Sequence, residues 1–175
     1  MKIKTGQSGF TLIELMVVVA ITGILTSVSL YSYFQSRPSR TLHSATRDIY
    51  STMMQAKIEA LRRGESVAVL FGTANDTYTM FRDNGAGGGT LSNGVQDGTE
   101  PTLIPATPLP ALATFDDAYG GDGVTFAGKV IIFSSRGLPV SPSGAMGSGT
   151  VGLQTSNLAI QQAVIVSTAG RIRIE

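Results

Sequence analysis

The sequence contains no cysteine, no tryptophan and a single histidine, His43. Without cysteine the chain forms no disulfide, and with one histidine it lacks the ligand sets of the usual zinc sites. A Ser-His-Asp site would have to use His43, and no G-x-S-x-G nucleophile elbow is present. We therefore predict a protein that is not an enzyme and has no small-molecule substrate, no metal and no cofactor. His43 is expected to be a solvated or packing residue.

Charge is missing from one long stretch near the N-terminus. No charged residue occurs in residues 15–36, and Glu14 is the only one in residues 10–34. An α-helix over residues 10–34 would be about 37 Å long, which is enough to cross the hydrocarbon core of a bilayer. The sequence therefore predicts one transmembrane helix, over residues 10–36.

Glu14 needs an explanation, because a carboxylate inside hydrocarbon costs roughly 2.5–3.5 kcal/mol even on lenient insertion scales. A cleaved secretory signal would explain the basic Lys2 and Lys4, but its apolar core normally spans about 7–15 residues and ends at a small-residue cleavage site. A plain signal anchor would explain the length and leave Glu14 unexplained. Charge gives a weak orientation signal, since Lys2 and Lys4 on one flank oppose Arg37 and Arg40 on the other.

The stretch "SGFTLIELMVVVAITGIL" resembles the class III leader and N-terminal helix of type IV pilins and pseudopilins. The resemblance implies that a prepilin peptidase cuts between Gly9 and Phe10, and that the new amine on Phe10 is methylated. It also implies that Glu14 meets the N-terminal amine of a neighbouring subunit in an assembled filament. Opposite charges about 4 Å apart at an effective dielectric near 20 attract by ~4 kcal/mol, which is comparable with the cost of burying the carboxylate alone.

The rest of the chain is expected to form one exported domain with little net charge. Without a leader of residues 1–9, which carries Lys2 and Lys4, the net charge changes from +1 to −1. Such a chain has no global basic field that would collect nucleic acid or bind a membrane surface. The part after residue 36 is long enough for one hydrophobic core and not for two.

The helix is expected to resume after an interruption or kink at Arg37-Pro38, because proline removes a donor and disfavours helical conformation in its predecessor. Apolar side chains then recur at intervals of three and four residues, and Gly64 is a natural stop. The sequence therefore predicts an amphipathic helix over residues 37–64, whose apolar face packs against a sheet.

Runs typical of strands dominate the remaining part of the chain. Residues 83–123 interrupt them with 9 Gly and 4 Pro, which predicts a long irregular surface loop that is mobile unless a neighbour orders it. Its "GAGGG" lacks a following Lys-Ser/Thr, so a flexible loop is expected rather than a phosphate cradle. The first two runs are joined by a hairpin at "TAND", and the expected strands are "SVAVLFG", "TYTMFRD", "GVTF", "KVIIFSS", "TVGLQ", "QAVIVST" and "RIRIE".

The C-terminal half adds a narrower resemblance. "IIFSSRGLPVSPSG", "TVGLQ" and "AVIVSTAGRIRIE" resemble the C-terminal pattern of the GspH/FimT family, the H-type minor pseudopilins of type II secretion systems and their minor-pilin relatives. This implies an α+β fold, in which the long N-terminal helix packs on a small antiparallel β-sheet domain, residues 65–175. It also implies a single-pass protein of the bacterial inner membrane, with a cytoplasmic N-terminus and a periplasmic domain, that joins other pseudopilins or pilins.

A DNA-binding minor pilin of a type IV pilus used in uptake is the alternative function, because the leader, helix and fold are shared. This alternative rests on the stretch "GRIRIE". In a strand, alternation would point Arg171 and Arg173 to one face and Ile172 and Ile174 into the core. These arginines would grip phosphates together with Arg136. Otherwise they solvate an edge strand or pair with carboxylates of a neighbouring subunit.

Acidic residues near "YGGDG" give one further candidate site. Asp116, Asp117 and Asp122 could supply oxygen ligands to calcium, but they lack the regular spacing of a calcium loop. We therefore expect a polar turn here.

Overall fold

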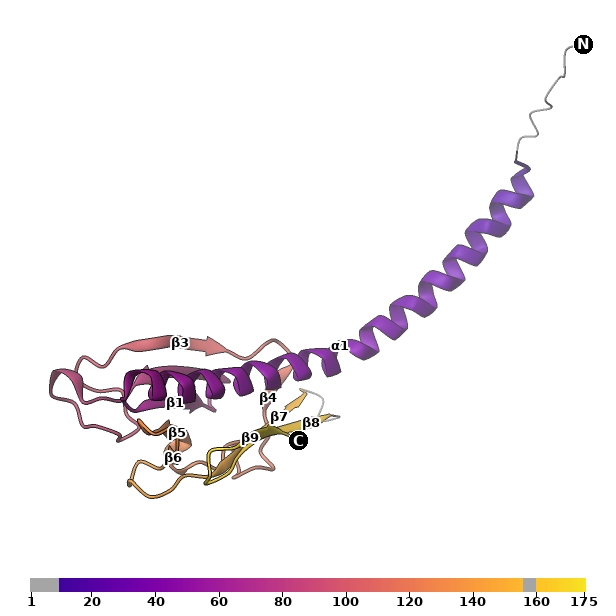
Figure 1. The fold of residues 1–175 in the computed structure, drawn as a ribbon. Helices are drawn as coiled ribbons and strands as arrows, with labels where there is room; N and C mark the ends of the chain where they lie inside the picture. Colours follow the sequence, from indigo (N-terminus) through magenta and orange to yellow (C-terminus); the bar gives the residue numbers. More distant parts are fainter. Residues whose placement is uncertain (1–9, 156–159) are drawn as a thin grey trace, which may run out of the picture. The chain divides into compact units, whose positions relative to one another are not determined.

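One long helix precedes a set of short strands in the computed structural model, which describes residues 10–155 and 160–175 (Figure 1). The helix, α1, spans Leu12–Arg63. The chain forms two compact units, one ending at Arg37 and one beginning at Pro38. The predicted α+β class, a long N-terminal helix followed by antiparallel strands, is confirmed.

Pro38 lies inside α1, so of the two predicted outcomes at Arg37-Pro38, an interruption or a kink, the interruption is wrong. A proline in a helix interior removes one backbone donor and costs about 3 kcal/mol or more. The lost bond is the one that residue 38 would make to the carbonyl of Phe34, while the residues on both sides stay helical. In a helix of 52 residues, the many remaining backbone bonds and the packing of the later turns outweigh one missing donor.

α1 ends where the sequence predicts, because Gly64 follows it with a φ of 69°. The N–H of Gly64 donates to the carbonyl of Ala60 at 2.9 Å, which closes the last turn. In the same turn, Arg62 and Arg63 donate hydrogen bonds to Glu59. These bonds, with Arg62 contributing most, lower the pKa of Glu59 to about 2.

Two antiparallel sheets complete the second unit (Figure 1). The first has the strand order β3-β2-β1-β5-β6 and the second the order β4-β7-β8-β9. The hairpin predicted at "TAND" joins β1 and β2. The strands are β1 Val67–Gly72, β2 Thr77–Arg82, β3 Thr102–Pro108, β4 Ala113–Phe115, β5 Val130–Phe133, β6 Pro139–Val140, β7 Gly149–Thr155, β8 Gln161–Val166 and β9 Ile172–Ile174, with short 3₁₀ helices η1 Ala86–Gly88 and η2 Ala127–Lys129.

Within the second unit, α1 covers a core that it shares with both sheets (Figure 1). The helix contributes buried side chains at three- and four-residue spacing, as predicted, among them Leu42, Ile49 and Met53. They pack with apolar side chains from strands of both sheets. A polar link joins α1 to the second sheet, since the hydroxyl of Thr46 donates to Oε1 of Gln162 in β8 at 3.0 Å. The amphipathic half of α1 therefore fixes both sheets around one core.

Residues 83–123 are not one irregular loop, because they contain β3 and β4. Pro105 and Pro108 argue against a strand in the sequence, because proline cannot donate to a sheet ladder. Proline is tolerated at a sheet edge, however, and β3 is an edge strand. The predicted strand "GVTF", by contrast, forms only an isolated bridge between Val124 and Val151. β6 was missed because a pair of residues has no periodicity to detect.

Two buried carboxylates hold the glycine-rich part of this segment. Asp83 accepts hydrogen bonds from the N–H groups of Asn93 at 3.2 Å and Gly94 at 2.8 Å. Glu100 accepts one from the N–H of Gly85 at 2.7 Å. Burial raises the pKa of Asp83 above its usual range, with the bonds from Gly94 and Asn93 opposing that rise. The segment is therefore tied down by bonds from side chains to its own backbone.

Candidate functional site

Glu14 lies in the first turn of α1 and caps the start of its own helix. The N–H and the hydroxyl of Thr11 each lie 3.4 Å from Oε2 of Glu14, and the N–H of Glu14 donates to the Thr11 hydroxyl at 3.3 Å. This is a capping box, in which a Thr before the helix and a Glu three residues later satisfy each other's backbone donors. Sequence reasoning missed Thr11, although the T-x-x-E spacing was visible. Glu14 therefore has a role in the single chain as well.

The predicted processing site lies only partly within the described residues. Gly9 lies outside them, and Phe10, the first of them, is 87% exposed. Both contacts of the Glu14 carboxylate use Oε2, and no described residue donates a hydrogen bond to Oε1. The exposed Glu14 carboxylate can therefore accept a cation from outside the chain while Thr11 holds its other oxygen.

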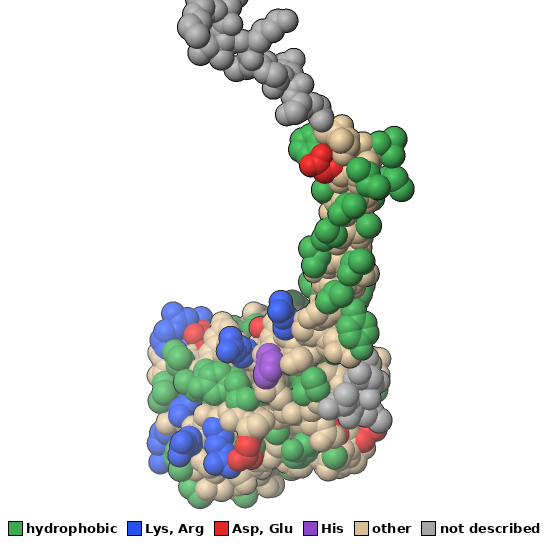
Figure 2. Space-filling view, turned by 90° about the vertical axis from the view of Figure 1, so that its right-hand side faces the viewer, with side chains coloured by type: hydrophobic (Ala, Val, Ile, Leu, Met, Phe, Trp, Pro, Cys, Tyr) green, Lys and Arg blue, Asp and Glu red, His purple; other side chains and the backbone are tan. Residues whose placement is uncertain are grey.

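The first unit exposes its apolar side chains. Every large apolar side chain in residues 10–34 is more than half exposed, and Figure 2 shows them covering this part of the helix in green. α1 contains an 18-residue window with a mean hydropathy of 2.1, so it is long and apolar enough to cross a membrane. An apolar surface of this extent requires lipid or another chain to cover it.

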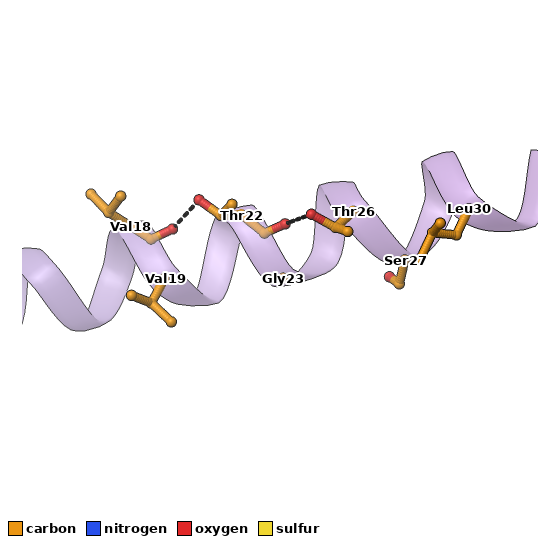
Figure 3. Close-up of a pocket in the computed structure, with 7 residues that line it drawn as sticks. All are labelled: Val18, Val19, Thr22, Gly23, Thr26, Ser27 and Leu30. Atoms are coloured by element: carbon orange, nitrogen blue, oxygen red, sulfur yellow. Dashed lines mark hydrogen bonds between the residues drawn. The ribbon is translucent and has the colours of Figure 1, made fainter.

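Hydroxyl groups within the apolar stretch are bonded to the helix itself (Figure 3). Thr22 donates to the carbonyl of Val18, and Thr26 donates to that of Thr22, both at 2.7 Å. Ser27 and Ser29 bond carbonyls of the preceding turn in the same way. Because each hydroxyl has an acceptor on its own helix, these residues can lie in hydrocarbon without an unsatisfied donor.

A shallow hollow lies on the same stretch of helix (Figure 3). No atom lies within 4 Å of the position that a Cβ on Gly23 would occupy. Gly23 and Ser27 are four residues apart, the spacing of small residues that lets transmembrane helices approach closely. The hollow thus suits contact with another apolar helix, and its lining is Val18, Val19, Thr22, Gly23, Thr26, Ser27 and Leu30.

In the second unit, Arg171 and Arg173 are both exposed at β9. Arg173 forms an exposed ion pair with Glu175, at 3.2 Å. The prediction that two isoleucines enter the core is right for Ile172, which is 8% exposed, and wrong for Ile174, which is 40% exposed. The reason is that β9 is the last strand of its sheet, and the core ends beside it.

Turns bring Arg136 close to Arg171. The carbonyl of Gly137 lies 3.1 Å from the position that a Cβ on Gly170 would occupy, so the β5–β6 and β8–β9 turns touch. Lys57 of α1 joins them by donating a hydrogen bond to the carbonyl of Gly170 at 2.7 Å. Lys57 therefore lies at the junction of the two turns, where Arg136 and Arg171 are the exposed chain neighbours of Gly137 and Gly170. Sequence reasoning missed Lys57, since no pattern links a helix residue to a turn 113 positions away.

The acidic residues considered for calcium form a turn. Oδ1 of Asp116 accepts a hydrogen bond from the N–H of Ala118 at 3.0 Å, and Asp122 forms an ion pair with Lys129. The Lys129 ammonium lowers the pKa of Asp122 below its usual range. Among the residues that the structure describes, no group of three or more His, Cys, Asp and Glu side chains could hold a metal. His43 is exposed on α1.

Comparison with solved structures finds similar chains. The minor pseudopilin EpsH from the type 2 secretion system of Vibrio cholerae is 14% identical, with a TM-score of 0.55 over 77% of this chain and 95% of that one. A second structure of that pseudopilin is 12% identical, with a TM-score of 0.54 over 78% and 96%. The type IV minor pilin FimU of Pseudomonas aeruginosa is 16% identical, with a TM-score of 0.49 over 78% and 90%. The EpsH structures show that the fold is pilin-like, as predicted.

Two family models match the chain itself. The prokaryotic N-terminal methylation motif matches residues 4–30, where the pilin-like leader was predicted. The model described as type II transport protein GspH matches residues 45–170, which is most of the chain and includes the first sheet and, apart from β9, the second. The predicted relationship is confirmed, and this chain belongs to the GspH family.

Proposed function

We propose that this chain is a minor pseudopilin, a structural subunit of the periplasmic pseudopilus of a type II secretion system. One observation carries the proposal: the GspH model over residues 45–170 and the methylation motif over residues 4–30 occur together on one chain. The fold shared with EpsH, a minor pseudopilin of such a system, agrees with it. The role is structural, so no catalytic step is assigned.

Processing and topology follow from the N-terminal motif. A prepilin peptidase removes residues 1–9 by cutting between Gly9 and Phe10, and the Phe10 amine is then methylated. The helix crosses the inner membrane once, with a cytoplasmic N-terminus and a periplasmic domain. The methylation motif and the exposed apolar helix support this arrangement.

Assembly gives Glu14 its second partner. In the membrane-anchored monomer the carboxylate caps the helix through Thr11. In the pseudopilus, Oε1 accepts the Phe10 amine of a neighbouring pseudopilin, and the two charges offset the cost of burying either alone. Other pseudopilins are thus the partners of the first unit.

The proposal is tested by removing the gene and measuring secretion. Loss of the chain should abolish export by the type II system, and the wild-type gene should restore it. A matched control is Asp117→Asn, an exposed substitution in the second unit, which should restore secretion because it leaves the N-terminal unit and β9 unchanged. Normal secretion without the chain, accompanied by loss of DNA uptake, would instead assign the chain to a type IV pilus.

The junction of the β5–β6 and β8–β9 turns favours a second candidate function, DNA contact by a minor pilin. The exposed Arg136 and Arg171 belong to these touching turns, and Lys57 bonds the second of them, so three cations stand where a backbone of phosphates could meet them. About three phosphate contacts predict that log K falls with log salt at a slope of roughly −3. Titration of the purified chain with duplex DNA at low salt tests this: binding lost in Arg171→Gln with Arg173→Gln, but kept in Arg62→Gln, supports it, and no binding removes it.

A further inference from the structure

The backbone of β9 points half of its hydrogen-bonding groups away from the sheet. Ala163 and Glu175 exchange both backbone bonds, at 2.9 and 2.8 Å, and Ser167 N–H donates to the carbonyl of Arg171 at 3.0 Å. In an antiparallel ladder the alternate residues then face outwards. These are Ile172 and Ile174, whose backbone groups bond no described residue.

The edge of β4 is covered by other parts of the chain. The N–H of Phe115 donates to Oδ1 of Asp76 at 3.1 Å, and that of Ala113 donates to the carbonyl of Pro110 at 3.0 Å. The outward donors of this strand are therefore occupied.

The other two edges are also protected. Beyond β6, Gly147 N–H donates to the carbonyl of Pro139 at 2.8 Å, and Val140 bridges Met146. Pro105 and Pro108 remove donors from β3. Among the sheet edges in the described part of the chain, β9 is left without such cover.

We propose that the edge of β9 binds an extended acidic segment of a partner pseudopilin, which adds a strand to the second sheet. The outward N–H and C=O groups of Ile172 and Ile174 provide the ladder, and the half-exposed Ile174 provides an apolar contact. Arg171 and Arg173 stand on the opposite face of the strand from these isoleucines, where acidic side chains of the added strand would lie beside them.

A second copy of the same strand is the competing occupant. An antiparallel β9–β9 pair that used both outward residues would set Arg173 directly opposite Arg173, which is destabilising, and Arg171 opposite Glu175 of the other copy, which is favourable. An acidic segment is preferred because it sets a carboxylate opposite both arginines without an arginine–arginine pair. The inference deepens the proposed assembly function and rests on it for its biological setting. Binding to the purified chain nevertheless tests the surface without any assembled pseudopilus.

The test uses the full chain in detergent and a short fluorescein-labelled peptide in which Glu and Val alternate. Fluorescence anisotropy should show binding to the wild type and to Ile174→Val, which keeps the N–H. It should be about tenfold weaker for Ile174→Pro, because that N–H is lost while the β8 ladder, which does not use it, remains. A peptide in which Lys replaces Glu should not bind.

A second measurement leaves the protein unchanged, in case Ile174→Pro disturbs folding. A Glu-Val peptide that is N-methylated at every Val cannot form the ladder to Ile172 and Ile174 while its Glu side chains lie beside the arginines, so it should lose binding in the same assay. Equal binding of the methylated peptide, equal binding to Ile174→Pro, or no binding to the wild type would each overturn the strand site. If duplex DNA bound the wild type and Ile174→Pro equally, and no peptide bound, the arginines would be assigned to nucleic-acid binding.

Discussion

The two units of the chain differ in how far their apolar side chains are exposed. In residues 10–34 the large apolar side chains are more than half exposed, whereas beyond Pro38 side chains such as Ile49, Met53 and Phe133 are fully buried. The second unit supplies its own cover in the form of two sheets. The first unit bonds the hydroxyls of Thr22 and Thr26 to its own helix and leaves its apolar surface to its surroundings. One unit is therefore stabilised by folding, and the other by its environment.

Blocking the cleavage of the leader should have the largest effect. Without cleavage, the first unit cannot move from the membrane into the proposed pseudopilus. Gly9→Val places a branched side chain beside the scissile bond, and we expect cleavage to fail completely. Intact-mass measurement of membrane-extracted protein should then show residues 1–9 retained, while Ser8→Ala is processed normally. If the wild type retained residues 1–9 in cells with an active peptidase, the processing proposal would be wrong.

A cavity in the core should affect only the unit that folds around it. Phe133 is fully buried in β5, so Phe133→Ala should lower the free energy of unfolding of the second unit by about 3–5 kcal/mol. Chemical denaturation of a truncated chain beginning at Pro38 would measure this, and we expect that chain to be a soluble, β-rich monomer. Membrane insertion of the full Phe133→Ala chain should be unchanged. A helix-dominated circular dichroism spectrum, or persistent aggregation of the truncated wild type, would contradict the fold assignment.

Removing the Glu14 charge should weaken assembly without weakening insertion. Glu14→Gln keeps the capping-box geometry but cannot form an ion pair with an amine, so crosslinking to partner pseudopilins should fall about tenfold or more. Membrane insertion should stay intact, because a neutral side chain is less costly in hydrocarbon.

Thr11→Ala provides the matched control for Glu14. It removes the cap and keeps the carboxylate, so crosslinking should remain near the wild-type level. If Glu14→Gln crosslinked as well as the wild type, the intersubunit pair would be excluded, and Glu14 would act in processing or extraction instead.

The smallest effect concerns an exposed ion cluster at the end of α1. Because the pKa of Glu59 falls from 4.5 to about 2 on folding, its contribution to stability is present above pH 4.5 and is lost as the pH falls towards 2. Glu59→Gln should therefore lower the melting temperature slightly at pH 7, where the pairs are intact, and leave it nearly unchanged near pH 2, which reduces its acid dependence in that window. Thermal melts across the window check this, with the exposed Asp117→Asn as control. An unchanged acid dependence would mean that the pairs with Arg62 and Arg63 do not persist in solution.

Features of the sequence with a local physical cause were predictable. The apolar stretch around Glu14, the buried stripe of α1 and the stop at Gly64 each follow from side-chain spacing or backbone freedom within a few residues. The strand β3 was not predictable, because Pro105 argues against a strand unless the edge position is known. Lys57 was missed for a related reason, since its partner Gly170 is distant in sequence.

In the proposed assembly, the hydroxyl bonds inside the first unit bear on how the subunit would leave the bilayer. Thr22, Thr26, Ser27 and Ser29 each bond their own helix, as the backbone does, so extraction from lipid into a bundle of neighbouring helices breaks none of these bonds. The helix exchanges lipid for neighbouring apolar helices, so its solvation free energy changes little. A small free-energy difference then suffices to drive the transfer. The proposed pairing of Glu14 with the amine of a neighbouring subunit can supply that difference. The same helix can therefore serve as a membrane anchor before assembly and as a filament core afterwards without refolding.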